Sequence, residues 1–95
     1  MSDVNIYDVI ILGSGPAGLT AALYCARGGK STIVLGGTVL GGQMAGIAKL
    51  ENYPGWNGSG MELIQFMAKQ AKSFGAKIEF ASATDIKFND DKTFT

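Results

Sequence analysis

Residues 7–18 decide the fold, and they read Tyr-Asp-Val-Ile-Ile-Leu-Gly-Ser-Gly-Pro-Ala-Gly. The unbroken apolar run 9–12 predicts a strand, from about Tyr7 to Leu12, that is covered on both faces of a sheet. Gly13, Gly15 and Gly18 then form the pattern G-x-G-x-x-G. The first glycine permits a tight turn, the second lets a pyrophosphate approach the backbone, and the third lets the next helix pack closely. Because the pattern follows a strand and opens a helix, it predicts a dinucleotide site rather than a glycine-rich turn without a ligand.

The residues after this turn predict a βαβ unit. Pro16 suits a first helical turn, where its missing N–H leaves no bond unmade. The segment from Pro16 to Arg27 therefore reads as a helix whose free N–H groups point at the phosphates. Ser31 to Leu35 is rich in β-formers and predicts a second strand, which should run parallel to the first through a right-handed crossover.

Length and composition limit the class of protein. Ninety-five residues make one small domain or part of a larger one, and eight basic residues balance eight acidic ones. This balance predicts no nucleic-acid partner and no membrane. The charge-free stretch 9–26 is short for a membrane span and is interrupted by glycines, while Asp3 and Asp8 precede it where a signal peptide would be basic. We therefore expect a cytoplasmic protein.

Two residue types restrict the chemistry. Cys25 is the only cysteine and there is no histidine, so this chain can form no internal disulfide, His-based triad or His metal site. Cys25 falls inside the predicted helix and is expected to be a small buried apolar residue.

The end of the second strand departs from the usual dinucleotide pattern. An acid there normally holds the ribose, but Gly36 and Gly37 occupy the position, and no acid occurs between Asp8 and Glu51. The ribose would then be held by backbone groups or by another part of the protein. Residues 36–46 are rich in glycine and read as too irregular for a helix or strand. They predict either a loop that lays N–H groups along a ligand or a flexible surface loop.

A second helix is predicted from the capping box that Ser59 and Glu62 form. It should run to about Phe74 and be closed by Gly75. Apolar residues at helical spacing are expected to face the core, namely Leu63, Met67, Ala71 and Phe74.

The last third of the chain predicts strands. Residues 76–80 alternate and give a third strand, with Ile78 and Phe80 on one face. Residues 85–88 and 93–95 then predict a β-hairpin around a turn at 89–92. The whole is an α/β, Rossmann-like βαβαβ parallel sheet followed by the start of a β-hairpin or meander. A hairpin that stops in its second strand suggests that these 95 residues are an incomplete domain and not the whole natural protein.

Three motifs together resemble a known family. They are the segment from Tyr7 to Tyr24, then Gly41-Gly42-Gln43, then Glu51-Asn52-Tyr53-Pro54-Gly55. Many flavoproteins share the first motif, and the other two are far more specific. The sequence resembles the start of thioredoxin reductase over nearly its whole length. The resemblance implies the FAD-binding domain of the low-molecular-weight type.

The resemblance also implies a site. The FAD pyrophosphate would lie on the segment from Ser14 to Ala17, and the loop from Gly36 to Gln43 would lie along the cofactor. Asn52 would lie close to the flavin, and a residue near Ala83 would approach the adenine through its backbone. The complete set of expected cofactor-binding residues is Gly13, Ser14, Gly15, Pro16, Ala17, Gly18, Gly36, Gly37, Gly41, Gly42, Gln43, Asn52 and Ala83.

The activity implied by the resemblance is that of a longer protein. Such a parent would pass a hydride from NADPH to FAD, then electrons to the disulfide of thioredoxin or a related protein, and would form a homodimer. The NADPH domain and the Cys-x-x-Cys pair of that family are not in these residues. We therefore expect no thioredoxin reduction by the 95 residues alone. Two alternatives remain: a ferredoxin- or flavodoxin-NADP reductase-like enzyme without the cysteine pair, and a non-catalytic excised nucleotide-binding fragment.

Overall fold

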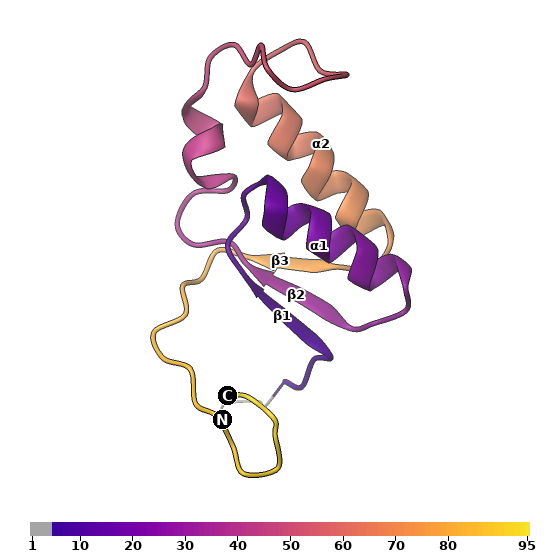
Figure 1. Ribbon diagram of the computed structural model, residues 1–95, viewed down its shortest axis with the longest axis vertical. Helices are drawn as coiled ribbons and strands as arrows, with labels where there is room; N and C mark the ends of the chain where they lie inside the picture. Colours follow the sequence, from indigo (N-terminus) through magenta and orange to yellow (C-terminus); the bar gives the residue numbers. More distant parts are fainter. Residues whose placement is uncertain (1–4) are drawn as a thin grey trace.

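The computed structural model describes residues 5–95 and has an α/β architecture (Figure 1). A parallel sheet of three strands carries two α-helices, with a short 3₁₀ helix between the second strand and the second helix. In chain order the elements are β1 (Val9–Leu12), α1 (Pro16–Arg27), β2 (Thr32–Leu35), η1 (Gly42–Gly46), α2 (Gly60–Ser73) and β3 (Lys77–Glu79). The predicted βαβαβ sheet is confirmed, with β1 and β2 each starting later than predicted.

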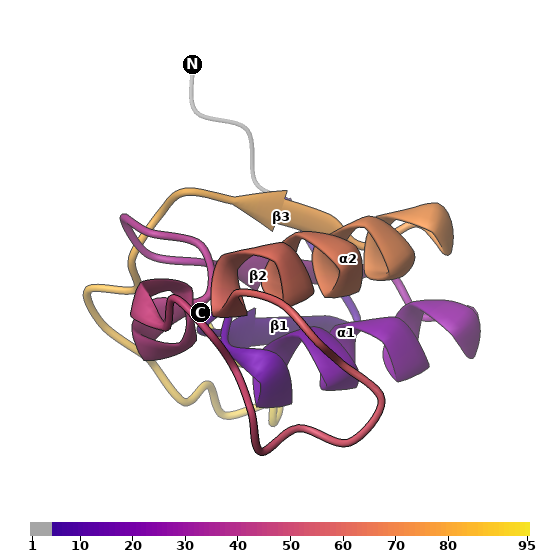
Figure 2. The same cartoon turned by 90° about the horizontal axis from the view of Figure 1, so that it is seen from above.

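The strand order places both helices on one side of the sheet. β2 lies in the centre and pairs in parallel with β1, with Val9 opposite Thr32, and with β3, with Ile33 opposite Lys77. The two crossovers step across the sheet in the same direction. Because such crossovers are right-handed, α1 and α2 cover the same face (Figure 2). This arrangement is one half of a doubly wound dinucleotide fold.

The core lies between the two helices and the sheet. Small residues dominate one cluster, which allows α1, α2 and β2 to approach closely. A second cluster lies nearer the start of both helices and is centred on Leu19 and Ile64. The buried members of the two clusters are Ala22, Ala26, Val34, Ala71 and Ala76 in the first, and Leu19, Ile64 and Ala68 in the second.

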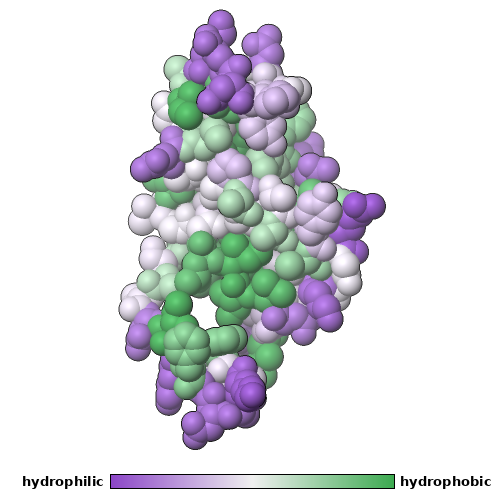
Figure 3. All heavy atoms as spheres, viewed as in Figure 1, coloured by the Kyte–Doolittle hydropathy of each residue, from purple (hydrophilic) through white to green (hydrophobic). Residues whose placement is uncertain are grey.

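The opposite face of the sheet is open, which corrects one prediction. The apolar run of β1 was expected to be covered on both faces, but Ile10 is 49% exposed and Leu12 is 51% exposed. Ile11, between them, packs against the helices. Figure 3 shows hydrophobic residues gathered below the helices, where Figure 1 draws the sheet. The prediction failed because both crossovers send their helices to the same face, and no element among residues 5–95 packs on the other.

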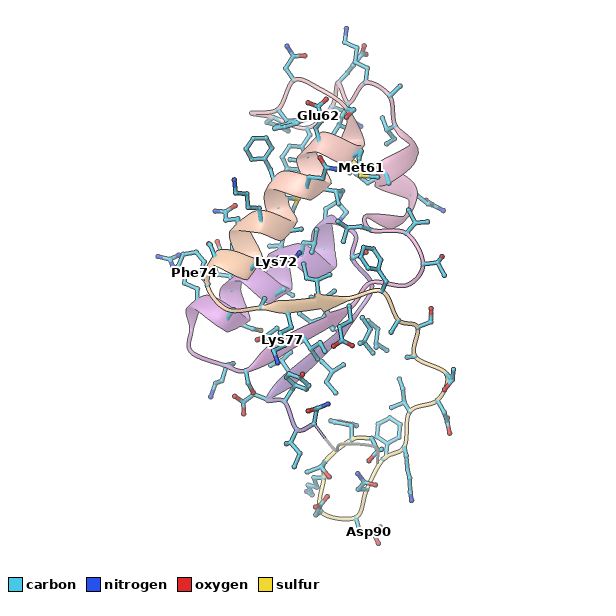
Figure 4. The ribbon with its side chains drawn as sticks, turned by 180° about the vertical axis from the view of Figure 1, so that it is seen from behind. Met61, Glu62, Lys72, Phe74, Lys77 and Asp90 are labelled. Atoms are coloured by element: carbon cyan, nitrogen blue, oxygen red, sulfur yellow. The ribbon has the colours of Figure 1, made fainter. Side chains whose placement is uncertain are left out.

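The capping box of α2 is confirmed. Ser59 Oγ accepts a hydrogen bond from the backbone N–H of Glu62 at 3.1 Å, and the Glu62 carboxylate accepts one from the N–H of Ser59 at 3.4 Å. At the other end of the helix, Phe74 was wrongly predicted to face the core and is 47% exposed (Figure 4). Phe74 is the C-cap, and Gly75 follows with φ +103°, so the chain leaves the helical stripe before Phe74 reaches the core.

The third strand and the hairpin are shorter than predicted. β3 ends at Glu79, and Phe80 is 71% exposed. The hairpin contains one antiparallel bridge, between Phe88 and Phe94. Their rings pack edge to face, with 5.2 Å between the ring centroids. Among the described residues these segments form no regular strand. An isolated two-stranded hairpin is marginal in water without a third strand or a helix beside it.

A reciprocal pair of hydrogen bonds ties the beginnings of β1 and β2 together. The Asp8 carboxylate accepts a hydrogen bond from the Ser31 backbone N–H at 2.9 Å, and Ser31 Oγ accepts one from the Asp8 N–H at 2.8 Å. The backbone N–H of Ser31, followed by its side chain, holds the pKa of Asp8 below its usual value of 3.8. The ionised carboxylate therefore stabilises the fold.

The stabilisation by Asp8 should depend on pH. A carboxyl whose pKa is lower in the folded state contributes stability above its unfolded pKa, and this is lost as the pH falls through the folded value. We expect Asp8→Asn to lower the urea midpoint of unfolding at pH 7. The gap, meaning the difference in midpoint between the variant and the unsubstituted chain, should close as the pH falls below about 4. Urea titrations at pH 7, 4 and 3 measure the gap. Asp90→Asn, which removes an exposed carboxylate elsewhere, is the control, and a gap independent of pH would contradict the assignment.

Candidate functional site

The candidate site lies at the carboxyl edge of the sheet, where ligands of open α/β sheets bind. Backbone hydrogen bonds continue the strand pairing past the strand ends and bring the loops together. The N–H of Gly13 donates to the carbonyl of Leu35 at 2.9 Å, and the N–H of Gly36 donates to the carbonyl of Glu79 at 2.8 Å. The turn after β1 and the loop after β2 therefore begin side by side.

The first and third glycines of the pattern are required by the protein itself. Gly13 has φ +112°, a left-handed conformation that side chains rarely adopt. Gly18 lies in the first turns of α1, and a Cβ placed on it would overlap the carbonyl oxygen of Gly13. These positions confirm the roles that the sequence predicts for them, a tight turn and a close approach of helix to strand.

The second glycine is different, because neither its backbone conformation nor the packing of residues 5–95 requires a glycine there. Gly15 is the N-cap of α1 with φ −72° and ψ 180°, a conformation open to any residue. A Cβ on Gly15 would come no closer to the protein than 3.9 Å, from the carbonyl oxygen of Gly41. The space in front of the helix is thus left clear. A side chain at this position would fill a cradle that the backbone otherwise leaves open to a ligand.

The groups that line this cradle suit an anion. Among residues 5–95, the N–H groups of Gly15, Ala17 and Gly18 donate no hydrogen bond to the protein. Pro16 has no N–H to leave unpaired. The positive end of the helix dipole lies here as well, and the first turn of α1 carries no acidic residue. Unpaired donors and a helix N-terminus together fit a phosphate group.

The side chain of Ser14 joins the two glycine-rich segments. Ser14 is buried, with 3% exposure, and its hydroxyl donates to the carbonyl of Gly36 at 3.0 Å. The same oxygen accepts a hydrogen bond from the N–H of Gly41 at 2.9 Å. Sequence reasoning missed this role because the two partners lie 22 and 27 residues away. A hydroxyl between the first two glycines of the pattern is the only sequence signal of it.

The second glycine-rich segment is more regular than predicted. The sequence was read as too irregular for a helix, but Gly42–Gly46 forms η1. Two glycines, one just before η1 and one at the start of α2, allow this segment to pack closely against α2. A Cβ on Gly41 would lie 2.7 Å from Ile64 Cγ1, and one on Gly60 would overlap the carbonyl oxygen of Met44. Tertiary packing against α2, rather than local propensity, fixes its path.

Hydrogen bonding limits what this segment can offer a ligand. The N–H groups of Gly36, Gly37 and Gly41 bond to the carbonyls of Glu79 and Ala81 and to Ser14 Oγ, respectively. One hypothesis from the sequence was that this segment donates its N–H groups to a ligand. These three N–H groups are already bonded within the protein and are not free to do so. Gly36 directly follows β2, and a Cβ on it would lie 3.1 Å from Ser14 Oγ. Crowding by Ser14 therefore gives a physical reason for glycine where an acid usually stands.

The remaining expected residues are more loosely connected to the cradle. Gly42 and Gln43 are exposed at the start of η1. Asn52 is exposed in the loop between η1 and α2, and Ala83 is exposed in the segment after β3. Within residues 5–95, neither Asn52 nor Ala83 hydrogen-bonds to the glycine segments. Ala83 does lie two residues beyond Ala81, whose carbonyl binds Gly37.

Other kinds of site find little support in the part of the chain that is described. Residues 5–95 contain no cluster of His, Cys, Asp and Glu that could hold a metal ion. No helix within the same range is long and apolar enough to cross a membrane. Cys25 is partly exposed on α1, which corrects the expectation that it is buried.

Known proteins are similar to this chain in both sequence and fold. Thioredoxin reductase from Aquifex aeolicus is 48% identical, with 96% of this chain and 29% of the relative covered. Thioredoxin reductase from Bacillus subtilis is 45% identical, with 90% and 28% covered. The chain thus spans less than a third of the length of these curated relatives.

Solved structures similar to this chain also include thioredoxin reductases. Thioredoxin reductase from Lactococcus lactis has a TM-score of 0.84 at 44% identity, covering 90% of this chain and 29% of that one. The enzyme from Streptococcus pyogenes has a TM-score of 0.84 at 40% identity, covering 90% and 28%. The resemblance to thioredoxin reductase is confirmed. A family model described as pyridine nucleotide-disulphide oxidoreductase matches residues 7–95. The chain belongs to the pyridine nucleotide-disulphide oxidoreductase family.

Proposed function

We propose that this chain is the FAD-binding portion of a thioredoxin-reductase-like flavoprotein and that the β1–α1 turn holds the FAD pyrophosphate. One observation carries the proposal: Gly15 is a glycine that neither backbone conformation nor packing demands, in front of N–H groups without acceptors. A pyrophosphate accounts for both features, because it needs donors and tolerates no Cβ in its path. Family membership of residues 7–95 supports the same ligand.

The residues of the cradle would then divide the work of binding. Gly15, Ala17 and Gly18 donate N–H groups to the phosphates, while Gly13 and Pro16 set the turn and the helix start. Gly42 and Gln43 would border the cofactor from η1. Asn52 near the flavin and Ala83 near the adenine are proposed from the resemblance. FAD supplies the redox chemistry when bound, and these residues bind and orient it.

The activity of a whole protein built around this portion is also a proposal. It would take electrons from NADPH and deliver them through FAD to thioredoxin or a related disulfide protein, as a homodimer. Residues 1–95 would form the N-terminal portion of its FAD-binding domain. We place this whole protein in the cytoplasm as part of the same proposal. Within residues 1–95, Cys25 has no second thiol with which to complete a disulfide exchange, so these residues alone would reduce no disulfide.

An NMR titration of the ¹⁵N-labelled chain tests the cofactor site. We expect FAD and ADP to shift the amide signals of Gly15, Ala17 and Gly18, because both ligands carry a pyrophosphate. Adenosine has no phosphate and is the matched control, which should leave these signals in place. The proposal would be wrong if millimolar FAD left the three amides unmoved, or if adenosine shifted them as strongly as ADP.

A further inference from the structure

We infer that Ser14 is a positioning residue whose hydroxyl holds the second glycine-rich segment against the first and so preforms the cradle for the FAD pyrophosphate. The inference rests on the proposed function and extends it to a side chain. It starts from the burial of Ser14, which is 3% exposed, and from its two hydrogen bonds.

The direction of both bonds is fixed by chemistry. A backbone N–H can only donate, so Gly41 must be the donor to Ser14 Oγ. The hydroxyl has one proton, which is then directed at the carbonyl oxygen of Gly36. One side chain thus satisfies a buried donor and a buried acceptor from two points on the same segment. No other residue type of this size offers both functions with the strength of a hydroxyl.

The position of Gly41 matters to the cradle. Apart from the residues next to Gly15 in the chain, its carbonyl oxygen is the atom nearest to where a Cβ on Gly15 would lie, at 3.9 Å. A carbonyl oxygen carries partial negative charge and would repel a phosphate if it moved inward. Gly41 has φ +90°, and as a glycine it can rotate more freely than other residues. The bond from its N–H to Ser14 Oγ fixes the peptide unit before Gly41, and so restricts how far the Gly41 carbonyl can move toward the phosphate site.

Among residues 5–95, the packing on the other side of Gly41 offers its N–H no second hydrogen-bond acceptor. Gly41 is pressed against Ile64 of α2, where a Cβ would lie 2.7 Å from Ile64 Cγ1. This contact limits movement toward the helix but makes no hydrogen bond. Loss of the Ser14 hydroxyl would leave the buried N–H of Gly41 and the carbonyl of Gly36 without their partner. The segment would then sample other arrangements, and FAD would have to order it on binding.

The test compares Ser14→Ala with Thr32→Val in the 95-residue chain. Thr32 is the matched control, because it is 2% exposed and its hydroxyl donates to the carbonyl of Lys30 at 2.9 Å, at the opposite end of β2. Each variant loses one buried hydroxyl, so a general loss of stability affects both. We expect Ser14→Ala to weaken FAD binding about tenfold relative to Thr32→Val.

Amide hydrogen exchange in the absence of FAD provides a second measurement. The Gly41 amide should exchange at least about tenfold faster in Ser14→Ala than in Thr32→Val, while core amides of β2 stay alike in the two variants. Equal FAD affinity and equal Gly41 exchange in the two variants would overturn the inference while leaving the proposed function intact. If the unsubstituted 95-residue chain bound no FAD, the proposed function would fail, and the cofactor role of Ser14 would fail with it.

Discussion

Replacing Gly18 with alanine is expected to destabilise the chain by about 3 kcal/mol, a large part of the stability of a small domain. The new Cβ would overlap the carbonyl oxygen of Gly13 and lie 3.3 Å from Ile11 Cγ2. The first of these is a backbone atom held by the turn, since Gly13 is in a left-handed conformation and its N–H is bonded to Leu35. Relief would require α1 to move away from β1. The urea midpoint followed by far-ultraviolet circular dichroism measures the loss.

Gly15→Ala in the same turn is the control for this prediction. Its Cβ would meet no protein atom closer than 3.9 Å, and its φ of −72° suits alanine. We expect its stability to stay within about 1 kcal/mol of the parent chain. If the two alanine variants lost equal stability, the close approach of α1 to the turn would not be what Gly18 provides.

Gly15→Val is expected to weaken FAD binding by at least about 100-fold and to leave the helices formed. The valine side chain would occupy the space in front of the unpaired N–H groups of the α1 start. Losing two hydrogen bonds to a charged phosphate costs about 3 kcal/mol, which corresponds to that factor. Fluorescence or calorimetric titration with FAD measures the affinity, and far-ultraviolet circular dichroism reports the helical content.

Gly46→Val is the matched control for the binding experiment. Gly46 lies at the end of η1, outside the expected site, and a Cβ on it would meet nothing within 4 Å. Its substitution adds the same side chain at an open position and should leave FAD affinity within about twofold. Binding that survived in Gly15→Val would show that the cradle is not where the pyrophosphate lies.

Local signals in the sequence were enough to predict the framework. Strand, G-x-G-x-x-G and helix follow one another within 21 residues from Asp8 to Gly28, and the roles of Gly13 and Gly18 depend on neighbours in the chain. The capping box of α2 is also local, since Ser59 and Glu62 are three residues apart. Such features are set by backbone geometry and short-range hydrogen bonds, which sequence patterns report directly.

What the sequence did not predict depends on residues far apart in the chain. η1 forms where packing on α2 forces a glycine-rich segment into a regular turn, and no local propensity announces this. The hydroxyl of Ser14 acquires its role only when β2 brings Gly36 beside it. The exposed face at Ile10 and Leu12 likewise follows from the direction of two crossovers, because an apolar run alone does not say which elements cover it.

The three glycines of the β1–α1 turn are expected to be under different selection pressures. Gly13 and Gly18 are held by conformation and packing, so any descendant that keeps the fold must keep them. Gly15 is free of both constraints, and only a ligand in the cradle would preserve it. In a lineage that retained the sheet but abandoned the cofactor, mutation would therefore erase the middle glycine first. If the proposed site binds FAD, relatives that keep the cofactor should keep all three glycines, and relatives that keep only the fold should keep the first and third.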